Sequence, residues 1–161
     1  MGFKSGDAVE SFPDPTGLAS ATGIGDVVYY GTGSTVPAGG LYYLNADGGW
    51  QAPNAAGTGS LGETAAGNAS LLGIALGTDP SADGMLIRGH FNTHLFGPIY
   101  SYVGAWQAGS AVYVASGSGM AGAMTGSAPT ATDSYVRVVG YCTPTVGVIK
   151  FDPDSVWVEI S

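Results

Sequence analysis

Glycine and proline interrupt this chain so often that no long helix fits anywhere in it. The longest stretch free of both residues is Thr130–Val139, ten residues. Within a helix, glycine costs about 1 kcal/mol and proline about 3 kcal/mol relative to alanine. The pattern therefore excludes coiled coils, helical bundles and doubly wound α/β sheets. Since 45% of the residues are hydrophobic and 11% are aromatic, the chain carries enough apolar surface to collapse. We expect a loop-rich, all-β domain.

The charge balance is strongly acidic. The chain has 4 Lys and Arg residues against 12 Asp and Glu, a formal net charge of −8. The four basic residues are scattered along the chain: Lys4, Arg88, Arg137 and Lys150. A nucleic-acid-binding protein neutralises several phosphates together, so we do not expect a nucleic-acid partner. The same charge argument disfavours an anionic membrane surface.

Targeting signals and cysteine chemistry are both sparse. No apolar run approaches the roughly 18 to 20 residues of a membrane-spanning helix. The first residues lack the apolar segment of a secretory signal. The single cysteine, Cys142, ends the strand-like run Val138–Cys142, where a buried and inert thiol is expected. We therefore expect the chain to fold in a reducing cytoplasm, whatever its final location.

Short β-type runs recur from Gly25 onward, between clusters of turn residues. Residues 1–23 differ from the rest and predict an extended N-terminal arm, followed by a single all-β domain over 24–161. The turn Asn45–Gly49 before Trp50 predicts a β-hairpin, because Asp and Gly tolerate a positive φ angle. The turn at 79–84 predicts a second hairpin. The expected strands are 27–30, 41–44, 71–76, 85–88, 138–142, 148–151 and 156–160. The segment 108–117 resembles 39–48, which contains the strand 41–44.

The second half of the domain repeats the plan of the first. Tyr42 and Tyr113 lie in matching apolar runs, and Gly73 and Gly140 each interrupt a later run. We expect approximate half-repeats over 25–98 and 99–161. Two such β-units packed on each other predict a small β-sandwich or barrel built from a degenerate two-fold internal repeat.

Possible metal sites are weak. His90 and His94 are four residues apart, which on an extended strand is about 13 Å at about 3.3 Å per residue, too far for one ion. Asp152 and Asp154 flank a proline, and Asp79 and Asp83 flank Pro80–Ala82, which is ordinary turn chemistry. We expect no metal and no cofactor.

Catalytic signatures are equally weak. No Gly-x-Ser-x-Gly sequence lies between a strand and a helix, and the Gly/Ser loops lack the lysine of a phosphate-binding loop. Glu10, Glu63 and Glu159 are the carboxylates most suited to glycoside hydrolysis, and nothing in the sequence pairs any two of them. We expect no enzymatic activity.

Aromatic residues remain as candidates for binding. Neighbours on a strand face opposite sides, so each of the pairs Tyr29/Tyr30 and Tyr42/Tyr43 predicts one core residue and one exposed residue. Core packing is the main alternative to an interface role, also for Trp157. The candidate interface aromatics are Tyr30, Tyr43, Trp50 and Trp106.

Several strand-and-glycine phrases resemble virion structural proteins of tailed bacteriophages, including those of cyanophages, and among them the capsid decoration (cement) type. The phrases are Leu72–Gly77, Asp83–Phe91, Gly109–Val114, Val136–Tyr141 and Trp157–Ile160. The resemblance implies an all-β protein without enzymatic activity that binds the outer surface of a capsid, often as a homotrimer. Its partner would be the major capsid protein.

The leading hypothesis is a decoration protein that stabilises the shell, with the N-terminal arm (Phe3, Val9 and Phe12) ordering on contact with the capsid. The main alternative is a tail-fibre or receptor-binding module that recognises host glycans through exposed Tyr and Trp. A hydrolase with an unrecognised site is a third possibility.

Overall fold

The structure is a computed structural model, and it describes residues 23–31, 37–56, 67–93 and 102–161. The prediction of an all-β fold is confirmed. Among these residues there is no helix long and apolar enough to cross a membrane. The strands are β1 (Gly23–Val28), β2 (Leu41–Leu44), β3 (Trp50–Gln51), β4 (Leu72–Ala75), β5 (Met85–Asn92), β6 (Tyr102–Val103), β7 (Ala111–Val114), β8 (Met124–Thr125), β9 (Tyr135–Val136), β10 (Val138–Cys142), β11 (Val148–Phe151) and β12 (Val158–Glu159).

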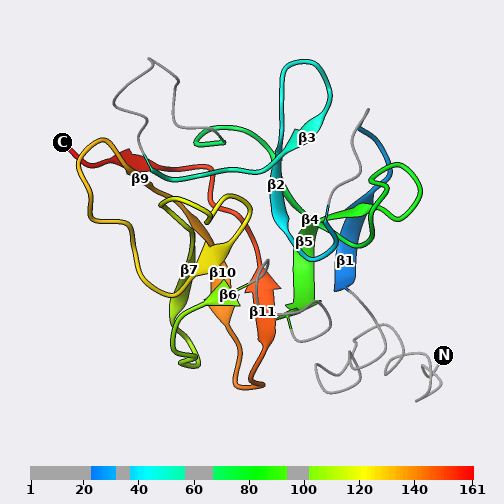
Figure 1. The fold of residues 1–161 in the computed structure, drawn as a ribbon. Coiled ribbons are helices and arrows are strands. Elements are labelled where there is room, and N and C mark those ends of the chain that lie inside the picture. The colour runs from blue at the N-terminus through cyan, green and yellow to red at the C-terminus, as the bar shows by residue number, and fades with distance from the viewer. Residues whose placement is uncertain (1–22, 32–36, 57–66, 94–101) are drawn as a thin grey trace, which may run out of the picture.

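Ten strands form one sheet that curls strongly into a half-barrel (Figure 1). Its strand order is β3-β2-β4-β5-β11-β10-β7-β8-β6, with β1 paired to β5 beside this path. All pairs are antiparallel except β6 with β8. β12 and β9 form a separate two-stranded ribbon near the C-terminus.

β5 is the strand on which the sheet divides. β1 pairs along nearly all of it, from Gly23 opposite Phe91 to Val28 opposite Met85. β4 pairs with the first two residues of β5, and β11 pairs with the last four. Since a strand has only two edges, β4 and β11 share the edge opposite β1. They diverge beside Ile87, which has no partner in β1 because the register slips there by one residue. Such a β-bulge bends a strand and redirects its side chains.

The strand order agrees with the internal repeat predicted from the sequence. Reading outward from the β5–β11 pair, β4, β2 and β3 on one side correspond to β10, β7 and β8 on the other. The registers also correspond: Gly73 lies opposite Tyr42 in β2, and Gly140 lies opposite Val112 in β7. The domain boundaries at 24–161 stay predictions.

The main part of the core lies on one face of the sheet. Alternation along the strands places apolar side chains from both halves there, as expected for strands with one buried face. The main cluster includes Leu41, Leu72, Ile74, Leu86, Phe91, Val112, Val114, Met124, Tyr135, Cys142, Ile149 and Phe151. A smaller cluster gathers Tyr42, Trp50, Ala75 and Met85. Along β2, β4 and β5 its members alternate with those of the main cluster, so it lies on the opposite face of the sheet.

Both predicted hairpins are present. Leu44 pairs with Trp50 across the 45–49 turn, and Gly48 there has a φ angle of 81°, which favours glycine. The Asn45 side chain accepts hydrogen bonds from the backbone N–H groups of Asp47 and Gly49. The second hairpin joins β4 to β5, with Ala75 opposite Met85. The predicted arm residues Phe3, Val9 and Phe12 lie outside the described residues.

Candidate functional site

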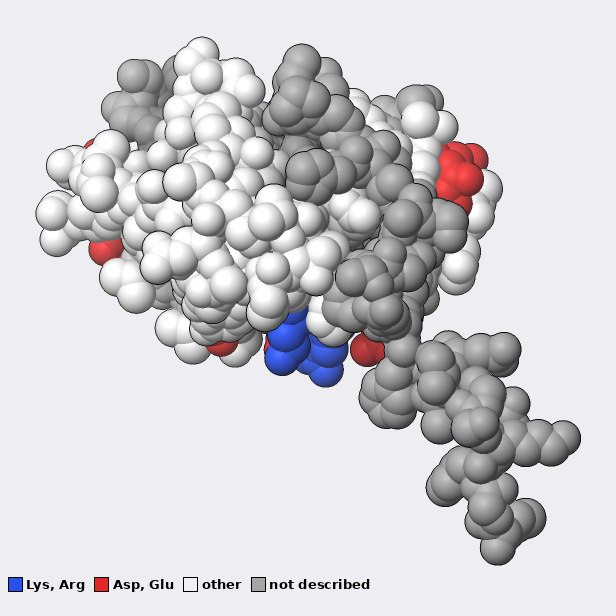
Figure 2. Space-filling model, turned by 90° about the horizontal axis from the view of Figure 1, so that it is seen from below, with Lys and Arg blue, Asp and Glu red and all other residues white. Residues whose placement is uncertain are grey.

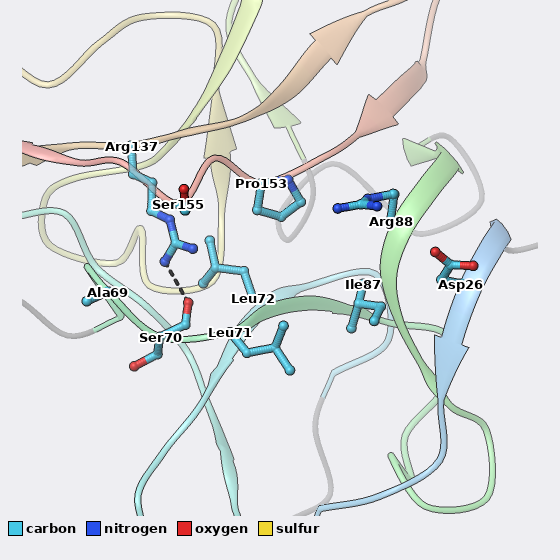
Figure 3. A pocket seen from close by; sticks show the side chains of 10 residues that line it. All are labelled: Asp26, Ala69, Ser70, Leu71, Leu72, Ile87, Arg88, Arg137, Pro153 and Ser155. Atoms are coloured by element: carbon cyan, nitrogen blue, oxygen red, sulfur yellow. Dashed lines mark hydrogen bonds between the residues drawn. The ribbon is translucent and has the colours of Figure 1, made fainter.

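A cleft of about 380 Å³ opens where β4 and β11 diverge from β5 (Figure 3). It lies at the junction of the two halves, a position where ligand sites often occur. Its lining combines charged, hydroxyl and aliphatic side chains from both halves. The residues are Asp26, Ala69, Ser70, Leu71, Leu72, Ile87, Arg88, Arg137, Pro153 and Ser155.

Arg137 is the most constrained side chain of the cleft. It follows β9 and precedes β10, and it is only 5% exposed. Its Nη1 donates to the carbonyl oxygens of Gly67, Asn68 and Ser70, at 2.9, 3.0 and 2.7 Å. Its Nε donates to the carbonyl oxygen of Asp154 at 2.9 Å. One guanidinium therefore joins the 67–70 loop of the first half to the C-terminal segment of the second.

Burial also affects the electrostatics of Arg137. Removal from water lowers the pKa of the Arg137 guanidinium from its ordinary value. Arginine begins from so high a pKa that it keeps its charge in proteins. The four acceptors above are neutral carbonyl oxygens, so the cleft holds a buried positive charge that no carboxylate among the described residues contacts through a hydrogen bond.

Arg88 lies at the solvent side of the cleft. Its Nε donates to Asp152 Oδ1 at 3.1 Å, and the two side chains are 69% and 45% exposed. Asp26 is the residue opposite Arg88 across the β1–β5 pair. An exposed pair of this kind contributes little to stability and exchanges partners easily.

The described part of the surface carries few charges. Its exposed cations are Arg88 and Lys150, since Arg137 is buried. Lys150 lies opposite His90, two residues along β5 from Arg88, so both cations project from the same face of the sheet. Figure 2 shows the Lys and Arg atoms of one face in a single group with acidic atoms close by.

The structure places the histidine and aspartate candidates in separate surroundings. His90 lies within β5, and His94 lies outside the described residues. Asp79 and Asp83 stabilise their own turn: Asp79 accepts hydrogen bonds from Ser81, and Asp83 accepts one from the Asp79 N–H group. Asp154 does not join Asp152 in any described interaction, and Asp152 pairs with Arg88. Over the described ranges, no three His, Cys, Asp or Glu side chains are grouped to hold a metal ion.

The carboxylates named for glycoside hydrolysis are not brought together among the described residues. Glu10 and Glu63 lie outside those residues, and Glu159 is exposed on β12. Cys142 is buried, as predicted, and its thiol contacts the Tyr102 hydroxyl at 3.8 Å. Burial, with this hydrogen bond as the second cause, raises the pKa of Tyr102 to about 12.

The aromatic pairs divide as predicted only in part. Tyr42 is buried and donates to the Pro37 carbonyl, whereas Tyr43 is half-buried and its hydroxyl bonds to the Gln51 side chain. For the other pair the prediction of one core residue is wrong: Tyr29 and Tyr30 are 63% and 45% exposed. The reason is that β1 ends at Val28, so strand alternation does not govern them.

The two tryptophan candidates are less accessible than an interface role requires. Trp50 is buried, stacks on Tyr30 with ring centres 6.3 Å apart, and donates to the Tyr30 carbonyl. Trp106 is half-buried against Tyr102 and donates to the Thr143 carbonyl. These contacts agree with the alternative of core packing.

The sequence reasoning treated Arg88 and Arg137 only as scattered cations and so missed the cleft. One signal was present: Arg137 stands between Val136 and Val138 in an apolar, strand-forming run. A charge in such a run is rarely left without partners when it is buried. Protein-family models, curated proteins and solved structures give no match to this chain.

Proposed function

We propose that this chain is a non-enzymatic structural protein of a virion, a capsid decoration protein that binds the outer surface of the major capsid shell and stabilises it. The resemblance to virion proteins of tailed bacteriophages supports this proposal. The physical support is a charge-poor β-surface that exposes apolar side chains beside open strand edges. Association of such a surface with other protein removes both features from water.

The β9–β12 ribbon carries the proposal furthest. Val156 and Val158 are 66% and 61% exposed, whereas Trp157 between them turns inward and packs edge-on against Tyr135. The N–H and C=O groups of Ile160 bond to Ser134 and Asp133 on the β9 side. Among the described residues no strand pairs with the other edge of β12. An extended segment of a partner can therefore add to this edge and cover the two valines.

Many copies held in a shell stabilise both partners by mass action, even when one contact is weak. We propose that the chain acts as a homo-oligomer, with the trimer implied by the resemblance. Its location would be the outer surface of the capsid.

The test is binding to shells assembled from the major capsid protein encoded in the same genome. We expect the purified chain to sediment with expanded shells at a copy number close to that of the capsid protein. Replacing Val156 and Val158 together by threonine should weaken this binding by about tenfold or more, because apolar burial is lost at about 25 cal/mol per Å².

Val146→Thr is the matched control. Val146 is also 63% exposed, but it lies in the turn before β11, away from the ribbon. The control should bind like the parent chain. A chain that stays in the supernatant with intact shells would refute the proposal, and equal binding by the ribbon variant would remove β12 from the interface.

A second candidate function is recognition of host glycans by a tail-fibre or receptor-binding module. The observation in its favour is the exposure of the adjacent Tyr29 and Tyr30. Exposed aromatic faces stack on sugar rings. Glycan-array binding that is lost in Tyr29→Ala and kept in Tyr141→Ala, together with only a few copies per virion, would favour this function over decoration.

A further inference from the structure

We infer that the cleft beside Arg137 binds an acidic side chain of the partner protein, with a neighbouring aliphatic side chain of the partner placed against Leu71 and Ile87. The inference rests on the proposed function and deepens it, because it gives the chemistry of the capsid segment that this face would recognise. It is independent of the β12 edge, which lies in the separate ribbon.

The hydrogen bonds of Arg137 leave one nitrogen for a ligand. To the described residues Arg137 donates from Nε and Nη1 alone. Among the described residues, every fully buried side-chain nitrogen has a hydrogen-bond partner. Since Nη2 has none, it is accessible from the open cleft. Figure 3 shows the guanidinium extending into the cleft between Ser70 and Leu72.

The chemistry of that nitrogen favours a carboxylate. A buried positive charge is costly unless it is paired, and the hydrogen-bond acceptors of Arg137 are neutral carbonyls. The carboxylate of Asp154 attracts the guanidinium through its charge, but no hydrogen bond joins the two groups. Nη2 also has a fixed direction, because Nε and Nη1 are already bonded. A carboxylate in the cleft therefore gains a charge-assisted hydrogen bond to a donor that is positioned in advance.

Arg88 supplies a second donor from the opposite side. Its bond to Asp152 is a single, exposed contact that a ligand carboxylate can replace. The acidic groups near this site are Asp26 in the lining, Asp152 beside Arg88 and Asp154 beside Arg137, and all three oppose an anionic ligand. Their presence predicts weak binding by the parent chain and gives the direction of a test, since removal of one of these charges should strengthen binding.

The remaining lining fits an aliphatic neighbour. Leu71 is 41% exposed although it directly precedes the fully buried β4, and Ile87 and Pro153 also line the cleft. Figure 3 shows the side chains of Leu71 and Ile87 at the same end of the cleft. The volume of about 380 Å³ lies at the lower end of the range for ligand sites, roughly 300 to 1,000 Å³, and suits two side chains rather than a long peptide.

The probes are two peptides, acetyl-Ala-Leu-Glu-Ala-amide and its glutamine counterpart. Nuclear magnetic resonance would follow the Leu71 and Ile87 methyl groups and the Arg137 Nε–H signal during titration of the full chain. We expect the glutamate peptide to shift these signals and to bind about tenfold more tightly than the glutamine peptide, the effect of one charge-assisted bond.

Three variants make the assignment specific. Arg88→Gln should weaken binding of the glutamate peptide by about threefold to tenfold, and Asp152→Asn should strengthen it by about twofold to fivefold. Lys150→Gln is the control, because it removes a cation from the same face without lining the cleft. Its effect should be less than twofold, about the size that screening leaves for a distant exposed charge.

Three results would overturn the inference: equal binding of both peptides, an equal loss in Lys150→Gln and Arg88→Gln, or tighter binding of acetyl-Ala-Gln-Leu through its free carboxylate. The experiment contains no capsid, so it fails separately from the proposed function. If the chain binds the peptide but not the shells, the cleft inference stands and the decoration proposal is rejected. If it binds the shells but not the peptide, the decoration proposal stands and the cleft inference is rejected.

Discussion

Gly73 and Gly140 occupy equivalent positions in the two halves of the sheet but have different neighbours. Each lies opposite the second residue of its partner strand, Tyr42 in β2 or Val112 in β7. A Cβ atom on Gly140 would collide with the backbone carbonyl oxygen of Lys150. A Cβ atom on Gly73 would lie 3.2 Å from the Trp50 ring, a side chain that can shift.

This difference predicts unequal costs for the same substitution. Gly140→Ala should lower the free energy of unfolding by about 3 kcal/mol or more, because backbone has to move. Gly73→Ala should cost about 1 kcal/mol, the lower range for an overpacked core. Urea denaturation of both variants measures the difference, and equal costs would contradict the register of β10 with β11, in which Gly140 lies opposite Phe151.

Arg137→Met should destabilise the fold by about 3 kcal/mol or more, because it leaves the carbonyl groups of Gly67, Asn68, Ser70 and Asp154 without their donor. Arg88→Gln is the control and should cost less than about 1 kcal/mol, as for other exposed ion pairs. Chemical denaturation compares the two. A small loss in Arg137→Met would mean that Arg137 does not hold the halves together.

The turn at residues 79–83 should loosen in acid. Hydrogen bonds from the Ser81 hydroxyl, the Ser81 N–H and the Ala82 N–H lower the pKa of Asp79 below its ordinary value of 3.8. A lowered folded-state pKa means that the contribution is present above pH 3.8 and is lost as the pH falls through the folded value. Amide shifts of Ser81 and Ala82 should follow that titration, and Asp79→Asn should abolish it. A midpoint above 3.8 would contradict the hydrogen bonding.

Alkaline conditions should destabilise the fold through two tyrosines. Burial raises the pKa of Tyr102 to about 12 from 10.0, and burial raises that of Tyr135 as well. A raised folded-state pKa gives stability that is complete below pH 10 and decreases as the pH rises above it. Unfolding free energies at several alkaline pH values measure this slope, which should be shallower in Tyr102→Phe. An unchanged slope would exclude Tyr102 as its source.

The fold class was predictable because it depends on local chemistry. Frequent glycine and proline exclude helices, and the Asn45–Gly49 turn specifies its hairpin without help from distant residues. The equivalence of Gly73 and Gly140 was also visible, since a glycine inside an apolar run marks a position where another group comes close to the strand.

The cleft could not be predicted in the same way. It depends on β4 and β11 meeting the same edge of β5, a pairing between residues far apart in sequence. The partners of Arg137 are backbone carbonyls, which every residue possesses, so no residue type identifies them. The exposure of Tyr29 and Tyr30 could not be predicted either. Strand alternation predicts one buried tyrosine, but β1 ends at Val28, directly before the pair.

The shared edge of β5 makes the two repeats mutually dependent. A C-terminal half expressed alone would lack β5, the strand that pairs with β11, and Val148–Phe151 would form an unpaired strand edge. Such a fragment would dimerise through that edge or precipitate. In the full chain the β5–β11 pair covers this edge, so each half supplies the partner strand that the other half needs.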